Sequence, residues 1–126
     1  MVNRVKLILV LLALVSCELP QRFPKSNSEY FNKPPDLSEV VYEGGDGKSL
    51  ENAIVIRNAK NERNGVAAEY AYISKKHGEK FTDWKPLEQY TSAQNNRRLD
   101  VVKVQIIQVS DTILYYFDIT DFFGKY

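Results

Sequence analysis

A chain of 126 residues has room for one small domain, and its 44% hydrophobic content is sufficient for a core. One cysteine excludes an internal disulfide, and one histidine excludes a metal site built from several histidines. The 17 basic residues almost balance the 16 acidic ones, which gives a net charge of +1. The basic residues are scattered along the chain, so the basic patch typical of nucleic-acid-binding proteins is missing. We therefore expect a domain stabilised by its core, without a metal or other cofactor and with no nucleic acid as partner.

The first sixteen residues are predicted to form a signal peptide. Arg4 and Lys6 precede an unbroken apolar run from Leu7 to Val15, and the small residue Ser16 stands directly before Cys17. This is the order of zones in an export signal. Nine apolar residues in a helix span about 14 Å, roughly half of a ~30 Å hydrocarbon core, so the run is too short for a transmembrane anchor.

The residues Leu14-Val15-Ser16-Cys17 resemble the lipobox of bacterial lipoproteins, which has a branched apolar residue at minus three, a small residue at minus one and cysteine at plus one. The resemblance covers the leader and the first mature residue only. It implies cleavage between Ser16 and Cys17, a diacylglyceryl group on the Cys17 sulfur and, often, a further acyl chain such as palmitate on the freed amine. Two or three acyl chains hold a protein on a bilayer far more firmly than one.

The predicted location is therefore the bacterial cell envelope, with membrane lipid bound through Cys17. Glu18 follows at the position where aspartate marks retention at the inner membrane of enteric bacteria. This gives a slight preference for the outer membrane, if the source is such a bacterium. Whether the domain faces the periplasm or the outside is left open.

A tether is predicted between the anchor and the domain. From Glu18 to about Leu37 the chain is rich in Pro, Ser, Asn and Lys, and its four prolines would interrupt a helix or strand. The three aromatic residues of this stretch either fold back onto the domain or have no structural role; they are Phe23, Tyr30 and Phe31. The predicted organisation is a signal peptide over residues 1–16, a lipidated tether over 17–37 and a globular domain over 38–126.

The domain is expected to open with two short strands around a glycine-rich loop. Residues 39–43 and Ile54–Ile56 have strand-like patterns. Between them, Gly44-Gly45-Asp46-Gly47 requires a tight turn or a close approach, and Ser49 can cap a short helical turn through Asn52. The loop lacks the glycine spacing of phosphate-binding loops and the ligand spacing of EF-hands, so an ordinary surface turn is expected.

The clearest helix is predicted to begin at Asn64-Gly65 and to end at Gly78. Basic residues in its last turn suit the negative end of the helix dipole, and Gly78 supplies the left-handed exit. Helical spacing predicts a core-facing stripe of Val66, Tyr70, Ile73 and His77, flanked by Ala67, Ala71 and Ser74.

Three further strands are predicted. Phe81 to Thr91 contains Pro86, which cannot donate a ladder hydrogen bond, so this strand should lie at an edge or carry a bulge. Leu99–Val109 and Thr112–Thr120 alternate apolar and polar residues on either side of a turn at Ser110-Asp111, and they should form an antiparallel hairpin at the centre of the sheet. The predicted fold is α+β, with one main helix packed on an antiparallel sheet of about four strands in two layers.

The C-terminal stretch from Tyr115 to Tyr126 has six aromatic residues among its twelve. Those less easily buried, together with a tryptophan, form the candidate binding patch: Trp84, Tyr116, Phe122, Phe123 and Tyr126. The favoured alternative is that this tail folds over an open end of the core.

No catalytic motif is present. Acylated Cys17 has no thiolate, and His77 is explained by its place at the helix end. Any acid and base would be carboxylates, such as Asp118 with Asp121 or Asp83 with Glu88, but sixteen acidic residues produce such pairs by chance.

We therefore expect a non-enzymatic binding or structural module at the envelope, with an envelope protein or glycan as partner. The alternative is a small carboxylate-based hydrolase acting on envelope glycan or peptide. A pocket with two converging carboxylates and a raised pKa would favour the hydrolase.

Overall fold

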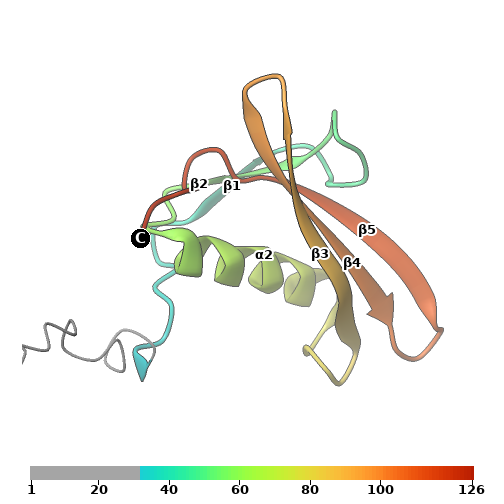
Figure 1. The fold of residues 1–126 in the computed structure, drawn as a ribbon. Helices are drawn as coiled ribbons and strands as arrows, with labels where there is room; N and C mark the ends of the chain where they lie inside the picture. The colour runs from blue at the N-terminus through green and yellow to red at the C-terminus, as the bar shows by residue number, and fades with distance from the viewer. Residues whose placement is uncertain (1–31) are drawn as a thin grey trace, which may run out of the picture. The chain divides into compact units, whose positions relative to one another are not determined.

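A sheet with one long helix across its face is the architecture of the computed structural model, which describes residues 32–126 (Figure 1). The elements in chain order are β1 (Val41–Gly44), β2 (Ile54–Arg57), α2 (Glu62–His77), β3 (Trp84–Gln94), β4 (Arg97–Ile106) and β5 (Asp111–Asp118). One compact unit extends from Pro34 to the C-terminus. The predicted cleavage and lipidation sites at Ser16 and Cys17, and the three tether aromatics, lie outside the described residues.

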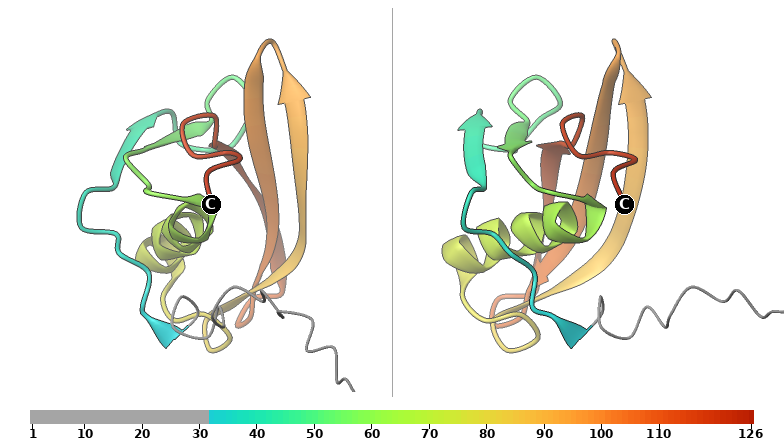
Figure 2. Two further views of the ribbon diagram at one scale, coloured as in Figure 1. Left: turned by 60° about the vertical axis from the view of Figure 1, so that its left-hand side comes forward. Right: turned by 90° about the vertical axis from the view of Figure 1, so that its left-hand side faces the viewer.

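The sheet has five strands in the order β1-β2-β5-β4-β3, and α2 packs on one of its faces (Figures 1 and 2). This confirms the α+β class with one main helix. The prediction of about four antiparallel strands is corrected, because β2 runs parallel to β5 while the other neighbours are antiparallel. The four-residue strand β2 carries no local sign of its partner. Its place beside β5 arises because α2, β3 and β4 intervene and the chain returns to it in the same direction.

The predicted hairpin and edge strand are both present. Strands β4 and β5 pair antiparallel over eight residue pairs, and β5 is the middle strand of the sheet. Strand β3 lies at an edge, and its register shifts between Pro86 and Glu88, as expected for a strand that contains proline. A second tight turn, which the sequence analysis did not predict, joins β3 to β4 through Asn95-Asn96. Both residues have positive φ (50° and 60°), the backbone that two-residue hairpins require and asparagine tolerates.

Helix α2 begins two residues earlier than predicted. Asn61 is its N-cap, since the Asn61 side chain accepts a hydrogen bond from the Asn64 N–H at 2.9 Å, and Gly78, with φ of 107°, ends it. Of the predicted stripe only Ile73 is buried, and the other buried residues are Asn64, Gly65, Ala68 and Glu69. Tyr70 also packs against the core, so the stripe is confirmed for Tyr70 and Ile73. The prediction missed Gly65, Ala68 and Glu69, because small residues let α2 approach its neighbours closely and because a glutamate is enclosed.

The glycine-rich loop combines a tight turn with a close approach, as predicted. Gly44 and Gly47 have positive φ, and a Cβ at Gly45 would overlap the backbone of Asn52. The Asn52 N–H donates to the Ser49 hydroxyl at 3.2 Å. This is the expected capping contact, but the residues that follow form a turn rather than a helix.

The core lies between α2 and the sheet. Its largest members come from both layers and include Ile54, Ile56, Ile73, Trp84, Val102, Val104 and Phe117. The segment before β1 also contributes, since Leu37 packs against this cluster. The neighbouring Asp36 accepts a hydrogen bond from the Lys60 ammonium at 2.6 Å, and this contact lowers the pKa of Asp36. Residues 36 and 37, which fall in the predicted tether, therefore contact the domain.

Candidate functional site

A groove of about 470 Å³ lies between the first half of α2, strands β3 and β4, and the segment after β5. Such a volume is within the range of small-ligand sites. Three elements and the C-terminal segment line it: Glu62 and Val66 from α2, Gln89, Tyr90 and Thr91 from β3, Asp100 from β4, and Ile119, Phe122 and Phe123 from the C-terminal segment.

The C-terminal segment that forms one wall is fixed to the start of α2. The Glu62 carboxylate accepts the N–H of Gly124 at 2.8 Å, and the Glu62 N–H donates to the Lys125 carbonyl, also at 2.8 Å. The Phe122 ring packs against Gly65 so closely that a Cβ there would overlap it. Backbone hydrogen bonds and a buried ring therefore hold this wall in place.

A cluster of polar side chains lies at the groove end of the interface between α2 and the sheet. The Gln89 amide donates to Glu69 Oε2 at 3.1 Å and to Asp100 Oδ2 at 2.5 Å, so it bridges the two carboxyl groups. The Thr91 hydroxyl donates to Asp100 Oδ1 at 3.0 Å, and the Tyr70 hydroxyl donates to the side-chain oxygen Oε1 of Gln89 at 2.6 Å. Glu69 is 0% exposed and Asp100 is 4% exposed, so this is a buried acidic pair.

Glu69 carries a proton at neutral pH. Burial, and then the neighbouring Asp100 carboxylate, raise the pKa of Glu69 to about 10. As a carboxylate, Glu69 would leave its Oε1 atom without a donor among the described residues. A protonated Glu69 removes that difficulty, because it can donate to Asp100. Of the two carboxyl groups, Asp100 is the one that lines the groove.

The five residues of the predicted aromatic patch do not come together on the surface. Trp84 is fully buried, and its indole N–H donates to the Gly78 carbonyl at 3.1 Å. Tyr116 is half-buried and alternates with Tyr115, so it lies on the sheet face away from α2. Tyr126 is exposed and does not line the groove. The exposed patch is therefore corrected, since its largest proposed member is a core residue.

Phe122 and Phe123, the other two members of that patch, both line the groove. Phe122 is 1% exposed and belongs to the core, whereas Phe123 is 41% exposed. The favoured alternative, in which the tail closes the core, thus holds for Phe122. Of these two consecutive residues, Phe122 closes the core and Phe123 leaves its ring exposed in the groove.

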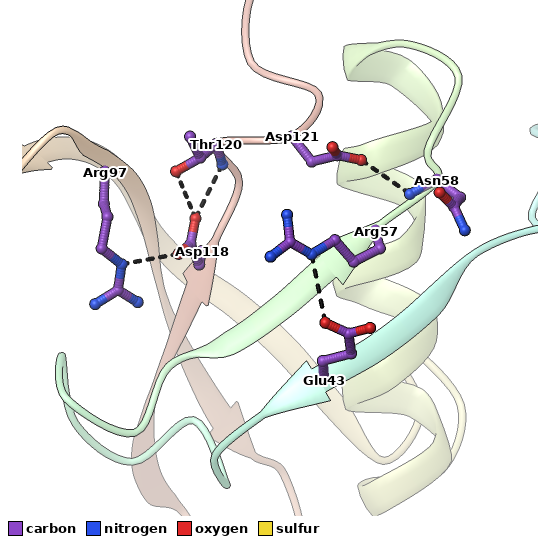
Figure 3. Close-up of polar contacts among 7 residues, drawn as sticks. All are labelled: Glu43, Arg57, Asn58, Arg97, Asp118, Thr120 and Asp121. Carbon is purple, nitrogen blue, oxygen red and sulfur yellow. Dashed lines mark hydrogen bonds and ion pairs between the residues drawn. The ribbon is translucent and has the colours of Figure 1, made fainter.

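The carboxylate pairs named from the sequence do not form. Asp118 binds Arg97 at 2.8 Å and Thr120, whereas Asp121 accepts the backbone N–H of Asn58 at 2.9 Å (Figure 3). Burial raises the pKa of Asp118, but the hydrogen bonds from Thr120 and Arg97 outweigh it and hold that pKa below its ordinary value.

The second pair is also divided between separate partners. Asp83 accepts the Glu79 N–H at 2.7 Å, and Glu88 lies 3.9 Å from Lys103. Each of these four carboxylates therefore has a structural partner of its own.

A second cleft, of about 400 Å³, lies at the other end of α2 and contains the single histidine. His77 Nε2 and the Tyr115 hydroxyl are 2.6 Å apart. The pKa of His77 is lowered, mainly by partial burial and to a smaller extent by the positive charge of Lys76. The position of His77 is thus explained by a tyrosine contact as well as by the helix end. The cleft residues are Asp46, Lys48, Tyr72, Lys76, His77, Ile113 and Tyr115.

Glu69, the most unusual residue of the buried polar cluster, was not predicted from the sequence. A glutamate in the middle of a helix is typical of a solvent-facing position, so nothing in α2 itself marks it. A weaker signal was present in β4, where Asp100 shares the alternation of Val102 and Val104 and therefore faces the core. A carboxylate on a core-facing position requires a partner, and this could have pointed to the pair.

Within residues 32–126 no cluster of three or more potential metal ligands occurs, and no helix is long and apolar enough to cross a membrane. No protein-family model matches the sequence, and neither the comparison with curated proteins nor that with solved structures found a significant match.

Proposed function

We propose that this chain is a lipid-anchored binding module of the bacterial cell envelope and that the groove beside α2 is its binding site. The observation that carries the proposal is the groove itself, a concave site of about 470 Å³ in which apolar and aromatic walls surround a few polar groups. That combination is typical of ligand sites, where the apolar walls supply affinity and the polar groups supply orientation.

The anchoring part of the proposal rests on the lipobox residues Leu14 to Cys17. In cells grown with a labelled fatty acid, the wild-type chain should incorporate the label and shift to the cleaved size. Cys17→Ser should do neither. A Cys17→Ser chain that is still labelled and cut normally would contradict the lipoprotein assignment, and it would leave the groove unaffected. Outer-membrane attachment belongs to the same proposal, and the occupant of the groove is either the envelope protein or glycan expected from the sequence or a smaller envelope molecule.

The binding part rests on how firmly the groove is built. Its walls come from a capped helix, from two paired strands and from a C-terminal segment held by Glu62. A site on fixed elements can orient a ligand without first ordering a loop, so less of the binding energy is lost to entropy. Phe123 supports the proposal further, because it exposes an aromatic ring at this wall instead of burying it.

Site-specific photo-crosslinking in living cells tests the binding function. A photoreactive phenylalanine analogue replaces Phe123 in the groove in one strain and Leu114 on β5 in another. The two side chains are matched in exposure, 41% and 39%, but only Phe123 lines the groove. We expect an adduct from position 123 and none from position 114, and the adduct should disappear when Val66→Trp fills the groove. Equal adducts at both positions, or none at position 123, would contradict the proposal.

A second function is favoured by one observation, the Glu69 and Asp100 pair. A protonated carboxyl beside an ionised one is the arrangement of a general acid and base, as in a small hydrolase acting on envelope glycan or peptide. Against it, Glu69 is fully enclosed and does not line the groove. Release of soluble fragments from purified envelope glycan by the wild-type chain, abolished in Glu69→Gln, would favour the hydrolase over the binding module.

A further inference from the structure

We infer that the groove binds a small organic amine, with its ammonium group at Asp100 and its apolar body against the aromatic wall. This inference rests on the proposed binding function and adds the chemical class of the ligand. Three properties of the groove lead to it: the sign of its charge, the location of the shared proton and the nature of its rings.

The groove is acidic. Its nine lining residues include two carboxylates, Glu62 and Asp100, and no lysine, arginine or histidine. Glu62 uses one oxygen to accept the Gly124 N–H, and Asp100 accepts from Gln89 and Thr91. An anion in this groove would be placed beside negative charge with no lining cation to compensate, whereas an ammonium group would be attracted to both carboxylates.

The Asp100 carboxylate has neutral hydrogen-bond partners and forms no ion pair with a lysine or arginine of the described residues. Its hydrogen bonds come from an amide and a hydroxyl, and the adjacent Glu69 shares a proton with it rather than neutralising it. The contrast with Asp118 is informative, because that carboxylate is also nearly buried but binds the Arg97 guanidinium at 2.8 Å. An ionised carboxylate at low dielectric attracts a counter-charge strongly, and Asp100 lines the groove, from which a cation can approach it.

The aromatic wall is suited to the same ligand. Tyr90, Phe122 and Phe123 border the groove, and aromatic ring faces attract cations. The fold already uses this interaction nearby, since the Arg98 guanidinium lies 4.8 Å from the Phe123 ring centre and the Lys80 ammonium lies 4.1 Å from the Tyr70 ring centre.

A free small molecule fits the site better than a protein surface. The groove volume is that of small-ligand sites, whereas a stable protein interface buries about 800 Å² on each partner and is usually much flatter. The ligand is therefore a small amine. It is long enough for its apolar part to reach Phe123 while its ammonium group is at Asp100.

Three probes with one apolar body separate charge from shape: 4-phenylbutylamine, 4-phenylbutanol and 4-phenylbutyrate. Binding of each to the full chain in detergent micelles is followed by amide chemical shifts of groove residues. We expect the amine to bind about tenfold more tightly than the alcohol, as expected for one hydrogen bond to a charged group, and the acid to bind most weakly. Asp100→Asn should reduce the preference for the amine to about threefold or less while the alcohol binds as before.

Two further variants keep the result interpretable. Glu62→Gln removes the charge of the other lining carboxylate but keeps a side-chain oxygen that can accept the Gly124 N–H. It should also weaken the amine without affecting the alcohol, so the charge effect is tested even where Asp100→Asn disturbs the fold. Asp111→Asn is the matched control, because it removes the same charge from an exposed strand end outside the groove. It should leave all three affinities unchanged.

The outcomes separate this inference from the proposed function. Equal binding of amine and alcohol, or a preference for the amine that persists in both groove variants, would overturn the inference that the ligand is an amine. The groove would still stand as a binding site. Failure of all three probes to shift groove residues would count against both. A lysine-containing tetrapeptide that bound while 4-phenylbutylamine did not would assign the groove to a protein partner and overturn the small-molecule proposal.

Discussion

Gly65 in the second turn of α2 lies directly against the ring of Phe122, and the contact leaves no room for a Cβ at position 65. Glycine is a poor helix former, so its presence inside α2 is explained by this approach rather than by local preference. The contact brings the C-terminal segment close enough to the helix to form one wall of the groove.

The first prediction follows from that contact. Gly65→Ala should destabilise the fold by about 1–3 kcal/mol through overpacking, even though alanine favours a helix by about 1 kcal/mol relative to glycine. Urea unfolding monitored by circular dichroism measures the change. Adding Phe122→Leu should recover part of the loss, since the smaller side chain makes room for the new methyl group. A stabilised Gly65→Ala variant would show that the contact is looser than described.

The two consecutive phenylalanines should respond differently to truncation. Phe122→Ala removes a ring that is 1% exposed and should cost about 3–5 kcal/mol. Phe123→Ala removes a ring that is 41% exposed and should cost less than about 1 kcal/mol, while it weakens ligand binding in the groove. Thermal melts of the two single variants make the comparison. Similar losses from both substitutions would contradict the division of roles.

The buried acidic pair should make stability depend on pH above the acid range. Because the pKa of Glu69 in the folded state is raised to about 10, the folded state holds a proton that the unfolded state releases above about pH 4.5. The stabilisation is complete below that pH and is lost progressively as the pH rises towards 10. Glu69→Gln, which cannot ionise, should show a smaller loss of stability between pH 5 and pH 9. Parallel pH profiles for wild type and variant would contradict the assignment of the proton.

The contribution of Asp118 to folding stability should change with pH in the opposite direction. Its pKa is held below the ordinary value, so its contribution is present above about pH 4 and is lost as the pH falls through the folded-state value. Asp118→Asn should cost about 1–3 kcal/mol at neutral pH, as expected for hydrogen bonds to a charged group. The control is Glu43→Gln, which breaks the exposed ion pair with Arg57 seen in Figure 3 and should change stability by less than about 0.5 kcal/mol.

Much of the fold could be predicted because its signals are local. Alternation marked the two strands of the central hairpin, Pro86 marked an edge strand with a bulge, and Gly78 marked the end of the helix. The parallel pairing of β2 with β5 could not be predicted. It is a contact between segments about sixty residues apart, and a four-residue strand does not encode its neighbour.

The site was harder to predict than the fold. Phe122 and Phe123 were named from aromatic density alone, and burial then separated them. Glu69 was missed because its partners, Gln89 and Asp100, come from two other elements, so no local spacing joins the three residues. Buried polar clusters assembled from distant segments become visible only when the tertiary structure brings those segments together.

The most direct test of this account is whether Glu69 keeps its proton at neutral pH. The single negative charge of the Glu69 and Asp100 pair and the loss of stability at higher pH both depend on it. Side-chain carboxyl ¹³C shifts of the full chain, assigned by comparison with Glu69→Gln, can be followed from pH 3 to pH 10. We predict that the Glu69 carboxyl shift stays at its protonated value through pH 7, while exposed glutamates change near pH 4. A Glu69 shift that changes with the exposed glutamates would contradict the account.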